Sequence, residues 1–121
     1  MFLRQRRNYL SGVGIVYEVV RALDILSQEA IVLSILIRNA PKPLTLGVMS
    51  EYYDHAWHSL NGNDEKFVCE STIKSAISQI RKKLDLQGLP EPIDTIKPSG
   101  YVLNEAFALW VRENLSISVP A

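Results

Sequence analysis

The segment ESTIKSAISQIRKKLD, residues 70–85, constrains the fold most, because its apolar residues recur every three or four positions. This spacing predicts a helix with one narrow apolar face, formed by Ile73, Ile77, Ile80 and Leu84. The opposite side carries mostly serines with a few basic residues, and no acidic residue occurs from 71 to 84. Serine forms helices less readily than the charged residues that usually cover a solvated face. That side is therefore either an ordinary solvated surface or a surface that contacts a partner.

The N-terminal part of the chain predicts strands followed by a buried helix. Residues 13–26 are rich in Val and Ile, which favours one or two strands, although residues 18–26 could also continue as a helix. Residues 28–39 are apolar on most sides, so we expect a core helix that is capped by Ser27. The prolines of 40–44 end this helix.

Two more helices complete the central part. Thr45 can cap a helix over 46–57. Residues 59–68 contain a Gly, two Asn and a charged run, so they form a loop before the helix at 70–85. Together these segments predict a three-helix body over 27–84.

A hairpin and a last helix are expected after this body. The connector 86–92 is rich in turn-forming residues. Residues 93–104 contain two short strand-like runs around a Pro-Ser-Gly turn, which predicts a β-hairpin. Asn104 can cap a C-terminal helix over 105–115, so the predicted fold class is α+β.

Composition limits the classes of function. A chain of 121 residues is expected to form one domain, 1–121, and 47% hydrophobic with 21% charged residues is typical of a globular protein. Thirteen basic and thirteen acidic residues give zero net charge, so binding to nucleic acid would depend on a local patch. The single cysteine, Cys69, favours a reducing compartment. No run is long and apolar enough for a signal peptide or a membrane span, so we expect a cytoplasmic protein.

No enzyme, metal or cofactor site can be assembled from the sequence. His55 and His58 are three residues apart, and no second cysteine or spaced acidic residue completes a ligand set with Cys69. Nothing near Cys69 has the pattern of a nucleophile with its base. We therefore expect no catalytic residue, no metal and no cofactor.

The order of elements is that of a winged helix, in which a helix-turn-helix pair is followed by a hairpin. The segments 34–45, 70–84 and 93–103 resemble the DNA-binding domain of the OmpR/PhoB-type winged-helix family. The hairpin of that family reads close to Thr-Val-Arg-Gly-x-Gly-Tyr, and residues 95–101 read Thr-Ile-Lys-Pro-Ser-Gly-Tyr. The resemblance covers most of 15–104 and implies N-terminal antiparallel strands, a three-helix body and a hairpin wing.

The resemblance also implies which residues meet DNA. The helix at 71–84 would lie in the major groove, and the wing over 96–101 would contact the backbone or the minor groove. The residues expected to face bases or nearby phosphates are Ser71, Thr72, Ser75, Ser78 and Gln79. Those expected to contact the DNA backbone are Lys74, Arg81 and Lys82, and Lys97 occupies the wing position. Thr45 is expected to contribute a phosphate contact through the backbone N–H groups at its helix start.

The expected function is sequence-specific binding of double-stranded DNA by a stand-alone transcription regulator of bacterial, phage or plasmid origin, without a receiver domain. RNA polymerase or another regulator is an expected partner, through the loop at 58–69 in the case of the polymerase. A homodimer formed by the C-terminal helix or the N-terminal sheet would suit paired half-sites. The alternative is a winged-helix interaction module that no longer binds DNA. It is suggested by the zero net charge and by Ser78-Gln79 where many relatives carry Arg-Arg.

Overall fold

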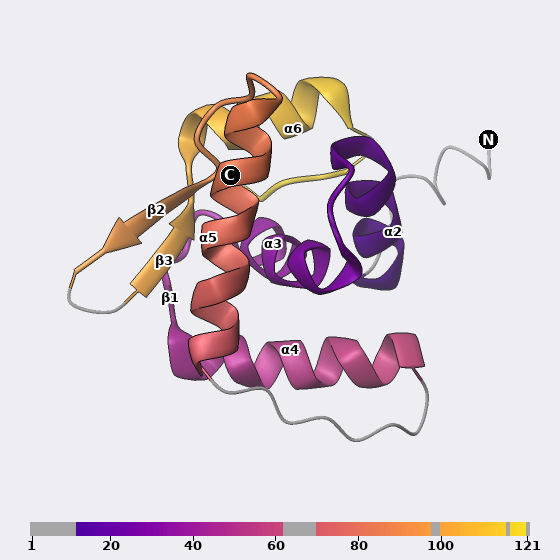
Figure 1. Ribbon diagram of the computed structural model, residues 1–121, viewed down its shortest axis with the longest axis vertical. Coiled ribbons are helices and arrows are strands. Elements are labelled where there is room, and N and C mark those ends of the chain that lie inside the picture. The colour runs from indigo at the N-terminus through magenta and orange to yellow at the C-terminus, as the bar shows by residue number, and fades with distance from the viewer. Residues whose placement is uncertain (1–11, 62–69, 98–99, 116, 121) are drawn as a thin grey trace.

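The computed structural model describes residues 12–61, 70–97, 100–115 and 117–120. These residues form five helices and a small antiparallel sheet (Figure 1). The helices are α2 (Gly12–Leu23), α3 (Ser27–Asn39), α4 (Leu46–Asn61), α5 (Glu70–Leu86) and α6 (Glu105–Asn114). The strands are β1 (Leu44–Thr45), β2 (Ile93–Ile96) and β3 (Gly100–Leu103). The arrangement is that of a winged helix, with β2 and β3 forming the wing.

The N-terminal strands predicted over 13–26 are wrong, because this segment forms helix α2 and a turn. Its buried residues are Ile15, Val16, Val19 and Leu23, whereas Tyr17 is 64% exposed. This pattern repeats with the helical period, and α2 packs it against α3. Packing of an apolar stripe on α3 therefore outweighs the strand preference of Val and Ile.

The central helices agree with the prediction. All residues of α3 from Glu29 to Ile37 are buried. In α5 the buried residues are Ile73, Ile77, Ile80 and Leu84, so the predicted apolar face is confirmed. The predicted Ser27 cap is wrong, since α3 begins at Ser27 itself and the Glu29 carboxylate accepts the N–H of Leu26 at 3.0 Å. Glu29 takes over the capping because its side chain is turned back to the helix start.

The sheet has the order β1-β3-β2, and both pairs are antiparallel. The predicted hairpin is confirmed, with Ile93 opposite Leu103 and Ile96 opposite Gly100. β1 adds a third strand that was not predicted, because two residues give no readable alternation. A side chain at Gly100 would approach the backbone oxygen of Leu44 to 3.4 Å, so glycine allows β1 to lie close to the wing.

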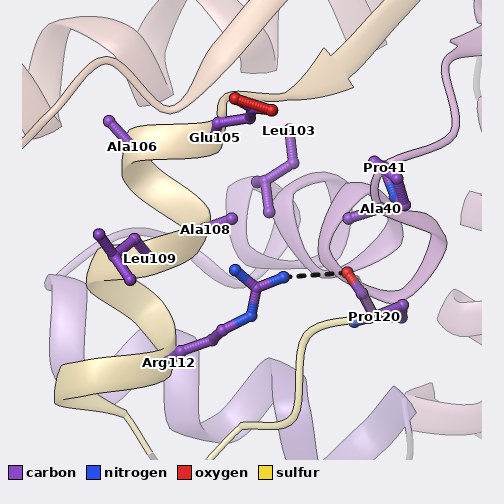
Figure 2. A pocket seen from close by; sticks show the side chains of 9 residues that line it. All are labelled: Ala40, Pro41, Leu103, Glu105, Ala106, Ala108, Leu109, Arg112 and Pro120. Carbon is purple, nitrogen blue, oxygen red and sulfur yellow. Dashed lines mark hydrogen bonds between the residues drawn. The ribbon is translucent and has the colours of Figure 1, made fainter.

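The C-terminal helix α6 is covered by the chain itself. Phe107 and Val111 are buried, and the following Ile117 and Val119 are buried as well. Arg112 holds this tail, since its Nη2 donates to the backbone oxygen of Pro120 at 3.1 Å (Figure 2). The predicted Asn104 cap is confirmed, because its Oδ1 accepts the N–H groups of Ala106 and Phe107.

Candidate nucleic-acid interface

The exposed face of α5 is formed by the polar residues singled out in the sequence. Its members, all exposed, are Ser71, Thr72, Lys74, Ser75, Ser78, Gln79 and Lys82. Ser71, Ser75, Ser78 and Lys82 form one row along the helix, since they recur every three or four residues. Short hydroxyl side chains leave the backbone of this row close to the surface, so a groove of nucleic acid can approach it.

Arg81 lies at the border of this face and is bonded within the protein. Its Nη2 donates to the backbone oxygen of Ile93 at 2.8 Å and to Oγ1 of Thr95 at 2.9 Å. Its Nε lies 3.1 Å from a carboxylate oxygen of Glu91. The guanidinium therefore joins α5 to the first strand of the wing, an anchor that the sequence prediction missed.

Lys83 is also bonded within the protein. Its Nζ donates to both carboxylate oxygens of Glu29, at 2.9 and 3.1 Å. Glu29 is only 4% exposed, so the ion pair links α5 to the buried helix α3. Lys82, between Arg81 and Lys83, is exposed and forms no ion pair with the described residues.

The charges that α5 presents to solvent balance one another. Lys74 and Lys82 are exposed, and so are Glu70 at the start of the helix and Asp85 near its end. The two cations lie within the row of serines or beside it, whereas the two carboxylates lie at the ends. The middle of the exposed face is therefore locally basic although the whole face is neutral.

The wing is anchored at its base and exposed toward its tip. Asn104 donates to the carboxylate of Asp94 at 3.0 Å, and its backbone N–H donates to the oxygen of Pro92 at 2.9 Å. Ile96 and Lys97 are exposed. Residues 98–99 lie outside the described residues. Lys97 thus follows directly after a strand that both α5 and the start of α6 hold in place.

Thr45 connects the start of α4 with the wing. Its Oγ1 accepts the N–H of Val48 at 3.2 Å, which confirms the predicted cap, and its backbone pairs with Gly100 in β3. The start of α5 is nearby as well, because a Cβ on Gly47 would lie 3.8 Å from Oε2 of Glu70. The first turn of α4 therefore has a carboxylate of the protein beside it.

The predicted site residues are thereby brought to one side of the molecule. The start of α4, the start of α5 and the wing lie together, with α5 standing next to the hairpin (Figure 1). α2 lies on the other side (Figure 1). Arg81 differs from the other predicted residues because its donors are directed into the protein.

Other features of the described residues give no competing site. A pocket of about 490 Å³ lies between α6, Ala40-Pro41 and Pro120 (Figure 2), but the cation that lines it, Arg112, is bonded to the tail. Burial, with a smaller effect of the Asp54 charge, raises the pKa of Tyr53, so its phenol stays neutral and serves packing. No three His, Cys, Asp or Glu residues among those described are grouped for a metal ion.

The loop at 58–69, which was expected to contact RNA polymerase, is described only in part. Cys69 and residues 62–69 of the loop at 58–69 lie outside the described residues. Within the described ranges, every helix is too short or too polar to cross a membrane.

Comparison with protein families identifies the family of this chain. The family described as "Transcriptional regulatory protein, C terminal" matches residues 21–103, which is more than half of the chain. No curated protein and no solved structure matches the chain.

Proposed function

The chain belongs to the family of transcriptional regulatory protein C-terminal domains, the OmpR/PhoB-type winged-helix DNA-binding domains, and we propose that it reads a specific sequence in double-stranded DNA. In this proposal the exposed face of α5 enters the major groove and the wing meets the backbone or minor groove. The family is one of regulatory DNA-binding domains and not of enzymes.

The observation that carries the proposal is the meeting of three elements on one side of the molecule. The first turn of α4, the exposed face of α5 and Lys97 lie there together. In this arrangement Ser71, Thr72, Ser75, Ser78 and Gln79 meet base edges or nearby phosphates, since hydroxyl and amide groups can both donate and accept. Lys74, Lys82 and Lys97 contact phosphates, and Thr45 places the start of α4 beside them.

The experiment is binding to a mixed-sequence duplex across a salt series, followed by fluorescence anisotropy. Three lysine–phosphate contacts give a slope of about −3 for log affinity against log salt. Lys74→Ala, Lys82→Ala and Lys97→Ala should each reduce this slope by about 1. The matched control is Arg21→Ala, which removes the same charge from α2 on the other side of the molecule.

Two outcomes would overturn this proposal. One is a folded protein that shows no affinity for duplex at low salt. The other is an equal response to salt in the three lysine variants and in Arg21→Ala. Selection of bound sequences from random duplex then tests specificity, and Gln79→Ala should relax the preference at one base pair by about 1–3 kcal/mol.

A second candidate function is an interaction module that binds another regulator in place of DNA. The exposed charges of α5 sum to zero, since Lys74 and Lys82 face solvent together with Glu70 and Asp85, and this favours the second function. This function predicts absence of duplex binding at low salt together with an unchanged fold by circular dichroism.

We further propose that the protein acts in the bacterial cytoplasm, as a homodimer on paired half-sites. Contact with RNA polymerase through residues 58–69 is part of the same proposal. Because Phe107 and Val111 of α6 are covered by the chain itself, dimerisation is not needed to bury them. Sedimentation with and without a two-half-site duplex measures the oligomeric state.

A further inference from the structure

Arg81 joins α5 to the wing through a set of close polar contacts. Three acceptors surround its guanidinium: the oxygen of Ile93 at 2.8 Å, Oγ1 of Thr95 at 2.9 Å and the carboxylate of Glu91 at 3.1 Å. The side chain is 34% exposed, so the contacts are partly shielded from water. All three acceptors belong to β2 or to the turn directly before it.

The geometry of these contacts suits arginine and no other cation. Nη2 bridges two acceptors that lie two residues apart on the same strand, while the Glu91 carboxylate forms an ion pair at Nε that is not aligned as a hydrogen bond. A guanidinium has its donors in a rigid planar fork, whereas a lysine ammonium is one point on a flexible chain. A lysine at this position would keep the charge but could not hold the strand in one orientation.

The base of the hairpin has a second anchor. Asn104, the residue directly before α6, donates from its side-chain amide to Asp94 in β2 and from its backbone N–H to the oxygen of Pro92. β2 is therefore held from α5 on one side and from the start of α6 on the other. Lys97 follows Thr95 by two residues, so only a few ångströms of extended chain separate Lys97 from the residue that Arg81 holds.

We propose that Arg81 is a positioning residue, which fixes the wing relative to α5 so that Lys97 and the exposed face of α5 meet the same stretch of DNA. This inference rests on the proposed function. It replaces the expected phosphate contact of Arg81, because Nη2 is bonded to two acceptors of β2. Lys82, the next residue, supplies the phosphate contact instead.

The two roles make opposite predictions for Thr95→Val. This variant removes one acceptor of Arg81 and changes no charge. If Arg81 positions the wing, the affinity for duplex falls about threefold to tenfold, since a charged hydrogen bond is lost. If Arg81 instead contacts a phosphate, its release from Thr95 leaves the affinity for duplex unchanged or raises it. That result would overturn the proposal.

Arg81→Lys provides a second variant that keeps the charge and avoids the larger disruption of Arg81→Ala. We expect it to weaken duplex binding about tenfold while the salt slope changes by less than about 0.5. Lys82→Ala is the matched control on the neighbouring residue, and it should lower the slope by about 1. A normal affinity of Arg81→Lys would overturn the positioning role.

A double-mutant cycle separates the wing from direct contacts. In the Arg81→Lys background, Lys97→Ala should have less than half of its usual effect, because the misplaced wing has already lost its contact. Thr95→Val should likewise add little in that background. Full additivity in both cycles would show that Arg81 does not act through the wing.

A measurement without DNA distinguishes failure of this inference from failure of the proposed function. Amide hydrogen exchange in β2 and β3 should be about tenfold faster in Arg81→Lys and Thr95→Val, and unchanged in Lys82→Ala. Unchanged exchange overturns the inference while duplex binding still stands. If exchange is faster in the two variants but the wild-type protein binds no duplex, the proposed function is overturned, and the role of Arg81 in DNA binding with it.

Discussion

The two halves of α5 serve different purposes, although both carry polar and basic residues. The first half, from Ser71 to Gln79, presents its polar side chains at the surface. The second half is joined to three other elements, by Arg81 to β2, by Lys83 to α3 and by Gln87 just beyond the helix to Leu23 of α2. The half whose polar side chains are exposed is thus held in place by a half that is bonded to the rest of the protein.

This difference shows that a basic run is not in itself a nucleic-acid contact. Three consecutive basic residues, Arg81, Lys82 and Lys83, point to the wing, to solvent and to a buried carboxylate. Successive residues of an α-helix are rotated by about 100° around its axis, so each of these three side chains meets a different environment. The number of basic side chains that this run presents to solvent is therefore smaller than its sequence suggests.

The largest effect is expected from Lys83→Ala. It leaves the Glu29 carboxylate, 4% exposed, without its cation, and should lower the free energy of unfolding by about 2 kcal/mol, because Lys83 itself is partly exposed. Urea denaturation measures this loss. Lys82→Ala, one residue away, should stay within about 0.5 kcal/mol of the wild type. Equal losses in the two variants would remove the distinction between these neighbours.

The next effect concerns the second anchor of the wing. Asn104→Ala removes the cap of α6 and the bond to Asp94, and should lower the free energy of unfolding by about 1–2 kcal/mol. Asn104→Ser is the control, since serine retains a cap but cannot reach Asp94 in the same way. If Asn104→Ser keeps both the stability and the slow amide exchange in β2 of the wild type, the bond to Asp94 has no part in holding the wing.

A smaller effect is expected at the start of α5. Glu70→Gln removes the carboxylate beside the first turn of α4, and should strengthen duplex binding about threefold at low salt. Asp85→Asn is the matched control at the far end of α5 and should have a weaker effect. The same anisotropy titration measures both. A gain equal in the two variants would mean that the start of α4 is not near a phosphate.

The smallest effect tests the row of serines. Ser75→Ala and Ser78→Ala should each raise the free energy of unfolding by about 0.5 kcal/mol, because Ala is the better helix former. The same variants should weaken binding to a selected operator, since each removes a hydroxyl from the surface. If both stability and operator affinity rise, the serines are not retained for contact with DNA.

Patterns within one segment were predicted well, and contacts between distant segments were not. The apolar face of α5, the hairpin and the caps at Thr45 and Asn104 follow from spacing and turn chemistry of neighbouring residues. The partners of Arg81 and Lys83 lie 12, 14 and 54 residues away, so no local pattern reveals them. A hint exists for Arg81, since it lies four residues after Ile77 and three before Leu84, and so borders the apolar face.

The wrong prediction of strands over residues 13–26 has a different physical origin. Val and Ile favour strands, but the stripe of Ile15, Val16, Val19 and Leu23 also fits a helix, and the choice depends on the surface of α3 that it covers. The DNA contacts stay a prediction for all candidate residues.

Helix α2 limits where the N-terminal layer tolerates substitution. What the core requires at this place is an apolar cover for α3, and α2 supplies it. The cover lies away from the wing (Figure 1). A change of sequence in this layer therefore has to preserve only the apolar stripe that covers α3, and the wing and the exposed face of α5 do not depend on what its outer side carries.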